Sequence, residues 1–123
     1  MQIITLQDTL PCVFSAEPPF RSEVWLQPGL DLKQGVSCLV SAESGAGKSS
    51  LCAYICGCRR DYKGSILFDG RDINSLTVKD WGRIRKEEIA YLHQDLALFP
   101  ELSAADNVFL NIRLTHYTSI EEI

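Results

Sequence analysis

A glycine-rich run between an apolar segment and a helical pattern constrains the fold of this chain more than any other feature. Residues 36–40 before the run suit a strand buried on both faces. Residues 48–58 after it carry apolar side chains at helical spacing, with Gly57 placed to end the helix. A strand, a tight loop and a helix are therefore expected in direct succession. The loop consists of Ala42, Glu43, Ser44, Gly45, Ala46, Gly47, Lys48 and Ser49, with Ser50 next.

The residues of this loop are suited to binding phosphate. Small residues let successive backbone N–H groups turn inward, and the start of a helix directs its positive end at the anion. Lys48 would reach the β- and γ-phosphates of a nucleotide, the Ser49 hydroxyl would bind Mg²⁺, and Ser50 would add a hydrogen bond to phosphate. The alternative, in which the glycines only make a turn, is disfavoured because loop, lysine and hydroxyl occur together before a helix.

Ala42 departs from the usual pattern, because loops of this kind usually begin with glycine. Alanine keeps the backbone N–H, but a positive φ at this position would cost about 1 kcal/mol. We therefore expect weaker loop geometry at most.

Length and composition allow one globular domain and exclude several classes of protein. The chain has 123 residues, of which 46% are hydrophobic and 23% charged, so it is not disordered, collagen-like or a coiled coil. A net charge of −4 argues against nucleic acid as a partner, and cations such as Arg59 and Arg83 are expected on a solvated face. Five cysteines without a secretion signal or membrane span indicate reduced thiols in a cytosolic chain.

The rest of the sequence predicts further strands and helices around the loop. Turns are expected at residues 33–35 and 69–70, and capping boxes at 77–80 and 103–106 predict the starts of two helices. Strands are expected over residues 2–6, 22–33, 36–40, 65–68 and 89–93. The pattern as a whole predicts an α/β fold.

Beyond the loop, the chain resembles the ATP-binding subunit of ABC transporters in two further segments. Residues 64–73 resemble the family's strand and turn after the Walker A helix, and residues 89–108 closely resemble its Q-loop region. The resemblance implies a partial P-loop NTPase fold, with an N-terminal antiparallel β-subdomain and the start of the parallel core sheet. Residues 1–123 would form the N-terminal part of that domain, because the signature motif, Walker B strand and switch histidine are absent from them.

The resemblance also implies roles for individual residues. The whole loop from Ala42 to Ser49, together with Ser50, would bind ATP as the Walker A motif. Gln94 would be the Q-loop glutamine, which in this family contacts Mg²⁺ and the attacking water and senses the transmembrane partner. Lys48 and Gln94 are therefore the expected catalytic residues, and Ser49 and Gln94 the expected Mg²⁺ ligands.

An aromatic residue upstream of the Walker A loop stacks on adenine in proteins of this family. Phe14 is the first candidate for this role, because the residues before it look like the strand that precedes the stacking segment. Phe20 is the alternative, and a purely structural role for Phe14 stays open. Trp25 is expected to serve packing alone.

The function implied by the resemblance is ATP binding in an ABC transporter, with ATP hydrolysis coupled to transport in the intact protein. Its implied partners are a transmembrane permease at the inner face of the membrane and a second ATP-binding subunit. Residues 102–108 resemble the lipoprotein-releasing and macrolide-exporter branch. Two alternatives stay open: a module that binds nucleotide or a partner without hydrolysis, and a P-loop ATPase unrelated to transport. The 123 residues alone are expected to bind Mg-ATP weakly without turning it over.

Overall fold

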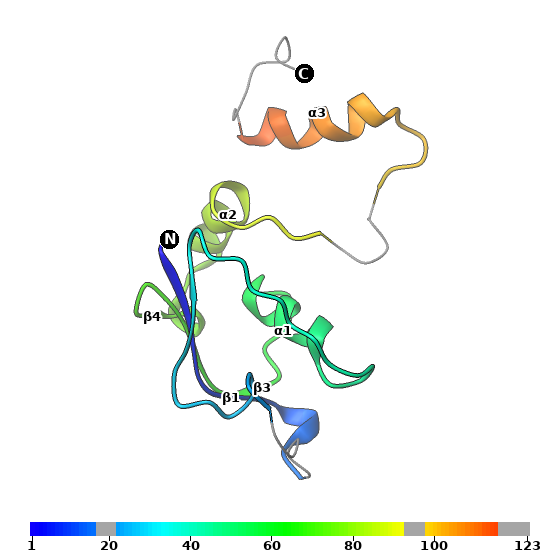
Figure 1. Cartoon of the computed structure of the whole chain (residues 1–123). Helices are drawn as coiled ribbons and strands as arrows, with labels where there is room; N and C mark the ends of the chain where they lie inside the picture. The colour runs from blue at the N-terminus through cyan, green and yellow to red at the C-terminus, as the bar shows by residue number, and fades with distance from the viewer. Residues whose placement is uncertain (17–21, 93–97, 116–123) are drawn as a thin grey trace. The chain divides into compact units, whose positions relative to one another are not determined.

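The computed structural model describes residues 1–16, 22–92 and 98–115. The chain divides into two compact units, Met1–Trp81 and Gly82–Ile123, each of which is described by itself. Figure 1 shows the order of the elements along the chain. No helix within the described ranges is long and apolar enough to cross a membrane.

The first unit is built on a four-stranded antiparallel sheet with the strand order β2-β1-β3-β4. Leu6 of β1 lies opposite Leu30 of β2 on one side and opposite Ile66 of β3 on the other. Leu6 and Ile66 are buried, so the centre of the sheet forms part of the core. The strands are β1 (Ile3–Pro11), β2 (Leu30–Lys33), β3 (Tyr62–Phe68) and β4 (Arg71–Asp72).

Strand β1 contains an irregularity that shapes its pairing with β3. The register shifts between Gln7 and Leu10, and Asp8 in this stretch has a φ of 49°. Opposite it, Gly64 has a φ of +84°, and a Cβ atom there would lie 2.3 Å from the Asp8 carbonyl oxygen. The buried Thr9 hydroxyl donates to the Ser65 carbonyl at 2.9 Å. This bulge therefore requires glycine at position 64.

Helix α1 (Lys48–Ile55) packs its buried face against aromatic side chains of the same unit. Tyr54 is fully buried, with its ring centroid 6.4 Å from that of Trp25 and 5.0 Å from that of Tyr62 on β3. The helix ends where the sequence predicts, because Gly57 adopts a left-handed φ of 74°.

The end of the first unit follows the expected turn and capping signals. Asp69 and Gly70 both have positive φ and connect β3 to β4, which leads into the 3₁₀ helix η2 (Ile73–Ser75). Helix α2 (Val78–Glu87) begins with a capping box, in which the Thr77 hydroxyl accepts from the Asp80 N–H at 3.1 Å and the Asp80 carboxylate accepts from the Thr77 N–H at 3.0 Å.

In the second unit, a compact turn precedes helix α3 (Ala104–Thr115). The Ser103 hydroxyl accepts from the Asp106 N–H at 3.1 Å, which confirms the predicted N-terminal cap. The Asn107 carboxamide accepts from the Phe99 N–H at 2.9 Å and donates to the Ser103 carbonyl at 2.9 Å. These bonds tie the turn to the first residues of the helix.

Three of the predicted strands are shorter than expected or absent. Of residues 22–33, only Leu30–Lys33 form a strand, because the Ser22 hydroxyl accepts from the Val24 and Trp25 N–H groups and turns the chain. Residues 36–40 form no strand, and the Leu39 side chain is 94% exposed. Residues 89–92 also form none, and His93 lies outside the described residues.

The two missing strands have a common physical cause. A strand of a parallel core needs neighbours that pair with its N–H and C=O groups and cover both of its faces. The described part of the chain holds only the antiparallel sheet, and neither segment joins it. The predicted α/β fold is therefore present as a small antiparallel sheet with a few helices, and the prediction that the parallel core begins within these residues was wrong for those described.

Candidate nucleotide-binding site

The glycine-rich loop enters helix α1 through two glycines in left-handed conformations. Gly45 has a φ of 85° and Gly47, the residue before the helix, has a φ of 96°. No side chain caps the helix, and the first bond of the helical ladder runs from the Leu51 N–H to the Gly47 carbonyl at 2.9 Å. The N–H groups of the first turn therefore have no partner within the helix, which is the arrangement that binds anions.

Ala42 fits the loop without backbone strain. The described non-glycine residues with positive φ are Asp8, Leu26 and Asp69, so Ala42 is not among them. The strain considered for alanine at the start of the loop is therefore absent.

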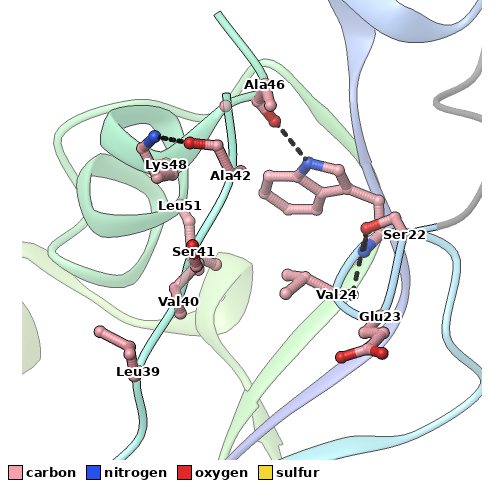
Figure 2. A pocket seen from close by; sticks show the side chains of 12 residues that line it. Ser22, Glu23, Val24, Leu39, Val40, Ser41, Ala42, Ala46, Lys48 and Leu51 are labelled. Carbon is pink, nitrogen blue, oxygen red and sulfur yellow. Dashed lines mark hydrogen bonds between the residues drawn. The ribbon is translucent and has the colours of Figure 1, made fainter. Parts of the chain in front are cut away.

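The polar residues after Gly47 differ in their surroundings. The Lys48 ammonium group donates to the Ala42 carbonyl and so bridges the two ends of the loop, as Figure 2 shows. Ser49 is exposed, as are Glu43 and Ser44. Ser50 is half-buried, and its hydroxyl accepts a hydrogen bond of 2.9 Å from the Arg59 guanidinium.

A cavity of about 430 Å³ adjoins the loop, within the size range of ligand pockets. Residues 22–25 form one wall and residues 39–42 form another (Figure 2). Ala46, Gly47, Lys48 and Leu51 complete the lining. The cavity thus lies against both ends of the predicted phosphate-binding loop.

Two aromatic side chains meet at Gly47. Phe14 belongs to the 3₁₀ helix η1 (Cys12–Phe14) and is half-buried. A Cβ atom on Gly47 would lie 3.3 Å from Phe14 Cε2 and 3.0 Å from Trp25 Cζ2. The Trp25 indole N–H also donates to the Ala46 carbonyl at 3.0 Å. The structure therefore brings the adenine-stacking candidate Phe14 to the loop, and it brings Trp25 there as well, which the sequence did not indicate.

Arg59 connects the first turn of α1 to Asp61, because its guanidinium donates to the Ser50 hydroxyl and forms an ion pair with the Asp61 carboxylate. The Arg59 Nε atom donates to the Asp61 carboxylate at 2.9 Å, and this guanidinium lies 5.5 Å from the centre of the Tyr54 ring. The hydrogen bond from Arg59 lowers the pKa of the Asp61 carboxyl group. Burial, followed by the Asp61 charge, raises the pKa of the Tyr54 hydroxyl. Arg59, expected on a solvated face, thus also contacts Ser50, and only the fold could reveal this.

Two candidate site residues belong to ranges other than those that the structure describes. Gln94, the predicted Q-loop glutamine, and Phe20, the alternative aromatic residue, lie outside the described residues. Within the described ranges, no group of three or more His, Cys, Asp or Glu residues could hold a metal ion. Of the two expected Mg²⁺ ligands, Ser49 lies in the described part of the chain, exposed in the first turn of α1.

Comparison with known proteins gives one family for most of the chain. The profile described as ABC transporter matches residues 27–123. The xylose import ATP-binding protein XylG of Escherichia coli (strain K12) is 37% identical over 89 residues, which is 71% of this chain and 17% of the relative. The proteins of the same name from Shigella flexneri serotype 5b (strain 8401) and Shigella boydii serotype 4 (strain Sb227) match to the same extent.

The chain thus spans about a sixth of the length of these relatives. The narrower resemblance of residues 102–108 to the lipoprotein-releasing and macrolide-exporter branch finds no support among them, because they are xylose import proteins. The matched region includes the glycine-rich loop and both of the other segments that resemble the family. The chain therefore belongs to the ABC transporter family.

Proposed function

We propose that this chain binds Mg-ATP through its loop at residues 42–49, as part of the nucleotide-binding subunit of an ABC transporter. The observation that carries the proposal is the loop itself. Gly45 and Gly47 turn the backbone into the start of α1, where the N–H groups of the first turn lack partners within the helix and Lys48 stands beside them. Membership in a family of ATP-binding proteins supports ATP as the ligand.

Binding would replace one contact within the loop by several to the nucleotide. The Lys48 ammonium group would leave the Ala42 carbonyl and bind the β- and γ-phosphates, which are stronger partners because they carry full negative charge. The N–H groups of the first turn of α1 would bind the remaining phosphate oxygens. Ser49 would hold Mg²⁺, which when bound neutralises the phosphate charge.

The remaining site residues have supporting roles in this proposal. Phe14 would stack on adenine, and its position against Gly47 supports this choice. Gln94 would contact Mg²⁺ and the attacking water in the full-length protein, a role that rests on the family resemblance. Ser50 would bind phosphate while its hydroxyl accepts from Arg59.

At the level of the whole protein, we propose that ATP hydrolysis drives transport through a transmembrane permease at the inner face of the membrane. A pair of ATP-binding subunits would work together there. The names of the relatives support import as the direction of transport, since all three are xylose import proteins. Family membership argues against a P-loop ATPase unrelated to transport.

Thermal unfolding with and without Mg-ATP tests the proposal. A ligand that binds only the folded state raises its stability by RT ln(1 + [L]/Kd), so wild-type protein should melt at a higher temperature with Mg-ATP. Lys48→Ala should remove the shift, whereas Gln94→Ala should largely keep it. Lys79→Ala is the matched control, because Lys79 is an exposed lysine outside the loop. An equal loss of the shift in the Lys48 and Gln94 variants would contradict the proposed division of roles.

A further inference from the structure

Trp25 makes two contacts with the glycine-rich loop that packing alone does not require. Its indole N–H donates to the Ala46 carbonyl at 3.0 Å. Its ring also packs on Gly47, where an added Cβ atom would lie only 3.0 Å from Trp25 Cζ2. The Ala46 carbonyl and the Gly47 N–H belong to the same planar peptide unit and point in opposite directions. A hydrogen bond that fixes the carbonyl therefore also fixes the direction of the Gly47 N–H.

The backbone that carries Trp25 is itself held in place. The Ser22 hydroxyl accepts from the Trp25 N–H at 2.7 Å, and the Leu26 N–H donates to the Thr9 carbonyl of β1 at 2.9 Å. Leu26 has a φ of 60°, which turns the chain directly after Trp25. The Trp25 ring also forms a T-shaped pair with the Tyr54 ring, with 6.4 Å between their centroids. These contacts hold the backbone and the ring of Trp25 in place, so the position of the indole N–H next to the loop is fixed by the fold.

We propose that Trp25 is a positioning residue that sets the Ala46–Gly47 peptide in the orientation that binds polyphosphate. This inference rests on the proposed nucleotide-binding function of the loop. Without the indole N–H, the Ala46 carbonyl would lose this hydrogen bond, and the peptide could rotate so that its N–H no longer faces the anion. The preorganised loop loses less entropy on binding, so the contact contributes to affinity.

A role for Trp25 in stacking on the base does not fit its surroundings. The side chain is only 5% exposed, because it packs against Gly47 and against the Tyr54 ring. A base needs an open ring face, which the half-buried Phe14 offers to a greater extent. Trp25 is therefore expected to affect the phosphate end of a nucleotide and not the base.

The test compares Mg-ATP with Mg-tripolyphosphate, which has the phosphates but no base, as ligands of Trp25→Phe. Phenylalanine keeps an aromatic ring and removes the N–H. The affinity for both ligands, measured by calorimetry, should fall about three- to tenfold, as expected for one lost hydrogen bond. Trp81→Phe is the matched control, because Trp81 is equally buried but packs on Phe68. This substitution should change the stability of the protein and leave the affinities for Mg-ATP and Mg-tripolyphosphate unaltered.

The outcomes separate this inference from the proposed function. A loss of affinity for Mg-ATP alone would place Trp25 at the base and overturn the inference. Unchanged affinity for both ligands would also overturn it, while the dependence of binding on Lys48 would still support the proposed function. Wild-type protein that binds neither ligand would overturn both.

A measurement on wild-type protein covers the case in which Trp25→Phe does not fold. The indole N–H resonance of Trp25, distinguished from that of Trp81, should shift when Mg-tripolyphosphate binds, because its acceptor belongs to the peptide that contacts phosphate. The Trp81 resonance should stay in place. A Trp25 resonance that does not move at saturating ligand would overturn the inference.

Discussion

Two separate features of the structure, the backbone conformation and the space for a side chain, require glycine at position 47. Its φ of 96° lies in the left-handed region, which costs any other L-residue about 1–2 kcal/mol. Its missing side chain also makes room for Trp25 and Phe14, which lie 3.0 and 3.3 Å from where a Cβ atom would be. The sequence pattern explains the first requirement, but only the fold shows the second, because position 25 is distant along the chain.

Gly47→Ala is therefore expected to lower the free energy of unfolding by about 1–3 kcal/mol, through strain and through crowding of the Trp25 ring. Gly82→Ala is the matched control, because Gly82 lies inside α2 with nothing within 4 Å of a Cβ and without positive φ. That change should raise stability by about 0.5–1 kcal/mol. Denaturant unfolding of both variants gives the comparison, and equal effects would contradict this account of Gly47.

Local signals predicted the helices and turns well at the scale of single elements. The capping box at Thr77–Asp80, the helix stop at Gly57 and the turn at 69–70 are all present, because each depends on residues a few positions apart. The strands predicted at 36–40 and 89–93 depend on partners far along the chain. No local pattern could supply those partners, so these predictions failed for the residues described.

The cap of α2 makes a prediction about pH. Hydrogen bonds from the Thr77 N–H and hydroxyl, with a smaller effect from Arg71, lower the pKa of the Asp80 carboxyl group. A carboxyl group with a lowered pKa in the folded state stabilises the fold above its unfolded pKa of about 3.9 and loses that effect as the pH falls through the folded value. The free energy of unfolding should therefore fall below about pH 4, and less steeply in Asp80→Asn. Identical slopes in the two proteins would exclude this role for Asp80.

In the candidate site, too, the sequence predicted the features that depend on neighbouring residues and missed the contacts between residues far apart in the chain. The loop and its glycines could be predicted because motif and helix start lie within ten residues of each other. The contacts of Trp25 with Ala46 and of Arg59 with Ser50 could not, because they depend on how β1 and β3 bring separate segments to α1.

At the scale of the whole molecule, the 123 residues contain the loop proposed to bind ATP, but only some of the groups that ATP hydrolysis requires. Transfer of the γ-phosphoryl group to water requires groups that orient the water and hold the metal. No Leu-Ser-Gly-Gly-Gln run and no apolar run ending in Asp-Glu follows Gln94 within the 123 residues. The chain also covers only 17% of the length of its relatives.

A protein of these 123 residues is therefore expected to bind Mg-ATP without steady-state release of phosphate, whereas a full-length protein that contains them should hydrolyse ATP. Lys48→Ala in the full-length protein should abolish that activity. A phosphate-release assay on both forms checks the prediction. Turnover by the 123 residues that disappears in Lys48→Ala would show that the hydrolytic groups lie within them.

The affinity for Mg-ATP of wild-type protein and of Lys48→Ala, measured by titration calorimetry, tests the central claim most directly. A hydrogen bond to a charged group contributes about 1.5–3 kcal/mol, so the variant should bind roughly ten- to a hundredfold more weakly. Lys79→Ala should bind like the wild type. Equal affinities of wild type and Lys48→Ala would contradict the claim that the loop at residues 42–49 binds the phosphates of ATP.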